Sequence, residues 1–177
     1  PICLVNLTFY RNTAQQEGGA IYGSQVKFES SDIDIQENSA GQGAGIKVMN
    51  SRSVAVINAS FLRNQASKEG GAIHAVQIGK FSAENLTVSE NRATSGSGLY
   101  LSGETVLDLS DSKLTHNEAT GKGGAIFVSV PSVTITDLEI SDNKANSGGG
   151  IFASDSILQI LGASFERNAA KLDGGAI

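Results

Sequence analysis

Apolar and polar residues alternate in register with an asparagine that returns every 25 to 27 residues. Counting back from each such asparagine, the positions ten and eight residues earlier are mainly apolar, and those nine and seven residues earlier are more polar. The position ten residues earlier holds Ile2, Phe28, Val54, Phe81, Leu107, Val133 and Leu158. Alternation with a period of two predicts a half-buried strand in every repeat.

Two further strands are predicted in each repeat. Six residues before the asparagine stands Asn, Asp or Gly, which tolerate a positive φ and therefore predict a corner. A short strand follows, with apolar residues such as Phe9 and Phe61 pointing inward. After a corner at the asparagine and a variable loop, a Gly-rich quartet of the GGAI type starts a third strand, whose inward residue is Ile21 in the first repeat and Ile73 in the third.

The recurring asparagines are predicted to be structural. They are Asn12, Asn38, Asn64, Asn91, Asn117, Asn143 and Asn168. A side-chain amide both donates and accepts, so each can bond to the same residue in the neighbouring repeats. Three strands and three turns in about 26 residues predict an all-β right-handed parallel β-helix of roughly seven coils. We expect residues 1–177 to form one repeat array that is a fragment of a longer solenoid.

Successive coils alternate in type. The distance from the asparagine to the end of the quartet is nine residues in one coil and eight in the next. The residue before the asparagine alternates in charge with the same period, as Arg11, Glu37, Arg63, Glu90, His116, Asp142 and Arg167. We expect these side chains to stack in a charge ladder that sets the register.

Composition narrows the function classes. The net charge is −5 and no run of Lys or Arg exists, which argues against a nucleic-acid partner. No apolar run is long enough to span a bilayer, so direct membrane insertion is not expected. The single cysteine, Cys3, is predicted to be a surface thiol.

No catalytic or metal site is predicted. The outward acids Asp34, Asp108, Glu139 and Asp142 do not converge, as the acids of polysaccharide-cleaving β-helices do. Neither histidine has a Cys, His or acid partner at metal-ligand spacing. We therefore expect a protein that is not an enzyme and needs no cofactor.

The residue after each quartet is the most informative variable position. It is Tyr22, Lys47, His74, Tyr100, Phe127 and Phe152 in the first six repeats. Because the preceding residue points inward, this position is expected to point outward and to form a stripe of rings. Loops or aliphatic neighbours could cover the rings; alternatively, the stripe could be a binding edge for a glycan or a neighbouring solenoid.

Three Asn-X-Ser/Thr sequons begin at the predicted corners, at Asn6, Asn58 and Asn85. In a secreted eukaryotic chain, glycans at these residues would line one edge of the solenoid. A corner Asn followed by an outward strand hydroxyl also produces the same motif without any glycan.

The combination of FxxN, as in Phe9–Asn12, Phe61–Asn64 and Phe165–Asn168, with GGAI at 18–21, 70–73, 123–126 and 174–177 resembles the repeat of the chlamydial polymorphic outer membrane proteins. This resemblance implies an autotransporter passenger, a β-helix displayed on the cell surface and used in adhesion.

Three functional hypotheses follow. The leading one is a non-enzymatic, extracellular or cell-surface solenoid that binds a glycan or a host protein. The second is a structural subunit of an extracellular filament or coat, in which neighbouring solenoid copies or flanking repeats are the partners. The third is a polysaccharide-active enzyme.

Overall fold

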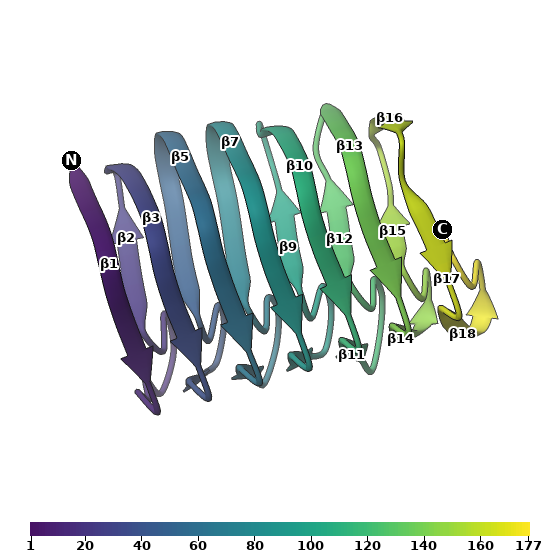
Figure 1. Ribbon diagram of the computed structural model, residues 1–177, viewed down its shortest axis with the longest axis horizontal. Helices are drawn as coiled ribbons and strands as arrows, with labels where there is room; N and C mark the ends of the chain where they lie inside the picture. Colours follow the sequence, from purple (N-terminus) through teal and green to yellow (C-terminus); the bar gives the residue numbers. More distant parts are fainter.

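The computed structural model describes all 177 residues and is a parallel β-solenoid of stacked coils, with the chain termini at opposite ends of the stack (Figure 1). It contains only β-strands and turns, and therefore no helix that is long and apolar enough to cross a membrane. The strands are β1 (Ile2–Tyr10), β2 (Ile21–Ser24), β3 (Lys27–Gln36), β4 (Ser39–Ala40), β5 (Ile46–Leu62), β6 (Gln65–Ala66), β7 (Ile73–Ser89), β8 (Arg92–Ala93), β9 (Leu99–Ser102), β10 (Val106–Thr115), β11 (Glu118–Ala119), β12 (Ile126–Ser129), β13 (Ser132–Ser141), β14 (Lys144–Ser147), β15 (Ile151–Ala153), β16 (Ile157–Leu161), β17 (Ser164–Glu166) and β18 (Ala169–Asp173).

The coil-to-coil pairing confirms the predicted β-helix. The long strands pair in parallel in the order β1-β3-β5-β7-β10-β13-β16 and lie side by side along the stack (Figure 1). Their register follows the repeat, since Ile2 pairs with Phe28, and Phe28 pairs with Val54. The strand before the predicted corner and the strand after it are one continuous long strand in most coils. The segment expected to be a variable loop contains short strands, and these form a separate sheet in the order β18-β14-β11-β8-β6-β4.

Residues with positive φ mark the corners. The predicted corner six residues before the asparagine is confirmed: φ is 55° at Asn6, 50° at Asn58 and 65° at Gly162. The corner expected at the asparagine itself lies one residue earlier, on the charge ladder, where Arg63 has φ 54° and Glu90 has φ 56°. At this corner the side chains of Arg63 and Glu90 are exposed, and the asparagine that follows each of them is buried.

The inward columns form one continuous core of 32 buried residues. Its largest side chains are Phe28, Phe61 and Phe81, which are fully buried. A separate small cluster of Ala40, Ala44, Ala66 and Ala93 packs beneath the short sheet.

The asparagines form the predicted ladder. Asn38, Asn64, Asn91, Asn117 and Asn143 are buried, and each donates its Nδ2 hydrogen to the Oδ1 atom of the next asparagine along the stack. The same Oδ1 atom also accepts the backbone N–H of the preceding asparagine, as in the 3.0 Å bond from Asn38 to Asn64. The ladder therefore satisfies the buried polar groups of the corner in successive coils.

Candidate functional site

The column that follows the quartets is a stack of parallel rings rather than a row of exposed faces. The ring centroids of His74 and Tyr100 are 4.9 Å apart, those of Tyr100 and Phe127 are 4.6 Å apart, and those of Phe127 and Phe152 are 5.5 Å apart. The interplanar angles are 4°, 4° and 9°. We call these four residues the aromatic stack. Neighbouring rings cover each other's faces, so the edges are what remain for solvent.

The prediction that this column is exposed is wrong for two of its residues. His74 and Lys47 are each only 3% exposed, whereas Tyr22 at the N-terminal end of the column is 48% exposed. Lys122, the residue before the fifth quartet, lies over the column: its Nζ is 4.3 Å from the ring centroid of Phe152. The suggestion that the column binds a glycan or another solenoid remains untested, but most ring faces are already occupied within the protein.

Lys47 replaces a ring in this column and is held by polar neighbours. Its Nζ lies 2.9 Å from Glu17 Oε1 and 2.5 Å from Gln42 Oε1. Gln42 in turn donates to Glu69 Oε2 at 2.6 Å. This network compensates the charge of a buried lysine beside His74, its register partner in the next coil.

His74 is held neutral by its surroundings. Burial, with a smaller contribution from the positive charge of Lys47, lowers the pKa of His74 to about 3. Its Nδ1 atom is buried without a hydrogen-bond partner. A neutral imidazole in this position acts as another flat ring in the stack.

The outward acids do not converge, and three of the four are held by cations. Lys80 Nζ lies 2.9 Å from Asp108 Oδ2, and Lys113 Nζ lies 2.8 Å from Glu139 Oε2. The guanidinium of Arg167 donates to both carboxylate oxygens of Asp142 at 2.8 Å, which lowers the pKa of that carboxyl. The fourth acid, Asp34, accepts a hydrogen bond from Gln36.

The charge ladder is also present. Arg11 Nε lies 2.7 Å from Glu37 Oε2, and Arg63 lies 3.6 Å from the other oxygen of Glu37. Farther along the stack, Asp142 contacts both His116 at 4.0 Å and Arg167 at 2.8 Å. These pairs join neighbouring coils at the exposed corner, where ion pairs contribute little to the stability of a fold. That they set the register remains a prediction.

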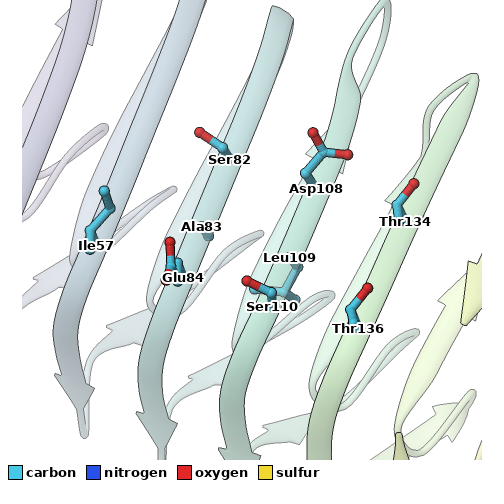
Figure 2. Close-up of a pocket in the computed structure, with 9 residues that line it drawn as sticks. All are labelled: Ile57, Ser82, Ala83, Glu84, Asp108, Leu109, Ser110, Thr134 and Thr136. Atoms are coloured by element: carbon cyan, nitrogen blue, oxygen red, sulfur yellow. The ribbon is translucent and has the colours of Figure 1, made fainter. Parts of the chain in front are cut away.

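A hollow of about 260 Å³ lies on the outer face of β5, β7, β10 and β13, and we call it the trough (Figure 2). It lies between two rows of outward side chains, with Ala83 and Leu109 between them. One row contains Ser82, Asp108 and Thr134, and the other contains Ile57, Glu84, Ser110 and Thr136. Serine and threonine side chains are short, so they leave space above the strands where larger residues would fill it.

A second hollow of about 230 Å³ continues along the same face toward the N-terminus and shares Ile57 with the trough. Its lining is more apolar and includes Cys3, Val5 and Ala55. Cys3 is a free, exposed thiol, as predicted. Of the two hollows, the N-terminal one is therefore the more apolar, and the trough is the richer in hydroxyl and carboxyl groups.

Sequence reasoning missed the trough because it treated these positions as ordinary solvated surface. The signal was present in the two polar columns, nine and seven residues before the asparagines, where short hydroxyl side chains occur in neighbouring repeats. Recognising a hollow also requires the distance between the two rows and the shape of the strands beneath them, which only the folded chain supplies.

The sequon asparagines lie at exposed corners and contact one another across coils. Asn85 Nδ2 donates to Asn58 Oδ1 at 2.9 Å, and Asn58 Nδ2 donates to Asp32 Oδ1 at 3.2 Å. Asn6 stands at the same corner of the first coil, with φ 55°. Glycosylation at these three residues remains a prediction.

Comparisons with known proteins agree with the repeat architecture. Residues 6–175 match the family described as periplasmic copper-binding protein (NosD). The chain is also 35% identical over 98 residues to the probable outer membrane protein PmpB of Chlamydia trachomatis serovar D, which covers 53% of this chain and 6% of that protein. This similarity agrees with the resemblance seen in the FxxN and GGAI motifs. No solved structure matches the chain.

The family description raises the question of copper. Copper sites in proteins are built from imidazole, thiolate and thioether ligands held close together. Here no group of three or more His, Cys, Asp or Glu side chains is placed to hold a metal ion. His74 is enclosed in the aromatic stack, and His116 faces Asp142 on the exposed corner. The residues of this chain do not fit a copper site.

The repeat, the stacked coils and the family match therefore point to the same conclusion. The match spans all seven recurring asparagines, from Asn12 to Asn168. This parallel β-solenoid belongs to the NosD family.

Proposed function

We propose that the chain is part of a non-enzymatic β-solenoid at the surface of the cell envelope, where its outer face binds a partner in adhesion. Two similarities support this location: one relative is described as a probable outer membrane protein, and the family is described as periplasmic. Extracellular display and adhesion go beyond what these descriptions say and are part of the proposal.

The observation that best supports binding rather than catalysis is the ion pair that Asp108, one of the two trough acids, makes with a lysine. Lys80 Nζ lies 2.9 Å from Asp108 Oδ2, so this carboxylate is engaged in an ion pair with a neighbouring side chain. The other trough acid, Glu84, lies on the neighbouring strand in the other row. Glycoside hydrolysis uses two carboxyl groups, and the ion pair with Lys80 leaves Glu84 as the one trough acid without a partner cation. This arrangement favours contacts to a ligand over acid–base chemistry.

The proposal is tested by adhesion of the purified chain to cultured animal cells. Fluorescent protein should bind saturably and be displaced by excess unlabelled protein. Absence of saturable binding would contradict the adhesion function. Electron microscopy of the same sample should show separate short rods; regular fibres would favour the filament hypothesis instead.

A parallel assay addresses the enzyme hypothesis. The wild-type chain and the Asp108→Asn and Asp142→Asn variants should all leave plant and microbial polysaccharides uncleaved, as measured by the release of reducing ends. Cleavage by the wild type that either variant abolishes would overturn the non-enzymatic assignment.

A further inference from the structure

We propose that the trough binds an uncharged oligosaccharide lying along the axis of the solenoid. This inference rests on the proposed binding function and names its ligand class and its location. The contacts would come from the two rows of outward side chains on β7, β10 and β13, shown together in Figure 2.

The spacing of the rows suits a repeating ligand. Ser82 pairs with Asp108 and Asp108 with Thr134 in one row, while Glu84 pairs with Ser110 and Ser110 with Thr136 in the other. Polar groups therefore recur once per coil, at about 4.8 Å, the usual distance between strands. A chain of sugar units parallel to the axis would meet a similar pair of rows at each step.

The chemistry of the lining suits sugar hydroxyls. Serine and threonine hydroxyls both donate and accept, and a carboxylate accepts from two neighbouring hydroxyls in charge-assisted hydrogen bonds. At one end of the trough, Ile57 is 39% exposed and borders the apolar hollow that contains Val5. A sugar ring has an apolar C–H face beside its hydroxyls, so it could use both kinds of surface.

Charge selects against acidic glycans. Lys80 is the cation beside the trough, and Asp108 already neutralises it at 2.9 Å. Glu84 adds a carboxylate, and the whole chain carries a net charge of −5. A sialylated or sulfated chain would face a carboxylate with no compensating cation, whereas a neutral chain would not.

A protein strand is a poorer fit to this surface. Strand addition needs an unpaired sheet edge. The trough lies over β5, β7, β10 and β13, which are internal strands that pair with neighbours on both sides. A ligand here must bind through side chains, which again favours a molecule rich in hydroxyl groups.

The test is binding of the purified chain to immobilised neutral hexose and N-acetylhexosamine oligosaccharides, with sialylated and sulfated oligosaccharides on the same array. We expect binding to a subset of the neutral chains. The Glu84→Gln and Thr134→Val variants should each weaken it by about tenfold, the effect of losing one good hydrogen bond. Thr87→Val is the matched control, because Thr87 is outward on β7 but outside the trough.

Thermal unfolding of all three variants keeps the test interpretable. Equal unfolding temperatures with a loss of binding only in the trough variants would support the proposal. Failure to bind any neutral chain, a preference for acidic chains, or equal binding by the trough variants and wild type would overturn it. If adhesion to cells persists in Glu84→Gln and Thr134→Val, the proposed adhesion function stands but the trough is not its site. If the chain binds glycans but does not adhere to cells, the trough site stands and the adhesion function is contradicted.

Discussion

Asn64 donates two hydrogen bonds to the single Oδ1 atom of Asn91 in the next coil, from its backbone nitrogen at 2.9 Å and from Nδ2 at 3.0 Å. The Nδ2 of Asn91 donates in turn to the backbone oxygen of Phe61 at 3.0 Å. Both asparagines are fully buried, so no water can replace these bonds. The side chain of Asn91 thus satisfies buried polar groups of the preceding coil as well as its own.

We expect Asn91→Ala to lower the free energy of unfolding by roughly 2–5 kcal/mol, because each buried polar group left without a partner costs about 1–3 kcal/mol. Denaturation in urea, followed by circular dichroism, measures the change. Asn12→Ala is the control: Asn12 is exposed and donates to Asn38, so water can replace its side-chain bond. Equal effects of the two substitutions would mean that the buried ladder does not limit stability.

The aromatic stack gives a second prediction. Tyr100→Ser removes a ring that contacts His74 on one face and Phe127 on the other. We expect a loss of about 1–3 kcal/mol in the free energy of unfolding, from lost stacking and the space left behind. Tyr22→Ser, at the half-exposed end of the same column, should cost clearly less. A stable Tyr100→Ser protein with reduced cell adhesion would instead support the stack as a binding edge.

Stability should fall between neutral and acidic pH because of His74. Its pKa is about 3 in the folded chain and 6.5 when unperturbed, so over this interval the unfolded chain binds the extra proton. The contribution of His74 to stability is therefore complete above pH 6.5 and declines as the pH falls toward 3. Each pH unit within this range is worth about 1.4 kcal/mol.

The His74→Phe variant isolates this contribution, since it keeps a ring in the stack and removes the titrating group. Unfolding in urea at pH 6.5 and at about pH 4.5 should show a decline for wild type that exceeds that of His74→Phe by about 2 kcal/mol. Paired carboxylates such as Asp142 contribute equally to both proteins and cancel in the comparison. Identical declines would show that His74 does not titrate as its burial implies.

Close contact between coils explains one of the quartet glycines. A Cβ atom on Gly71 would lie 2.5 Å from the backbone oxygen of Ser97 and 2.8 Å from that of Arg92, both in the next coil. Because backbone atoms cannot move aside singly, we expect Gly71→Ala to destabilise the fold by about 1–3 kcal/mol. The matched control is Ala44→Gly, since the equivalent quartet position in the preceding coil already holds a methyl group. Thermal unfolding of both variants checks the contrast.

The sequence by itself determined the architecture, because a repeat imposes the same environment on each copy. The spacing of the asparagines gave the coil length, and the alternation around Phe28 and Val54 gave the inward face that the structure confirms. The positive φ at Asn6 and Asn58 was predicted from the Asn, Asp and Gly residues that recur at that position of each repeat. These features are local or repeat with the coil, so pattern is sufficient to predict them.

Only the tertiary structure decided what each outward column does. The sequence placed His74 and Tyr100 on the outside, but in the folded chain His74 is buried and the two rings stack in parallel. Similarly, Ser82, Glu84 and Ser110 read as plain surface until neighbouring strands bring them around one hollow. Exposure and concavity depend on distances between coils and on what covers a side chain, and neither is encoded in the period of a single column.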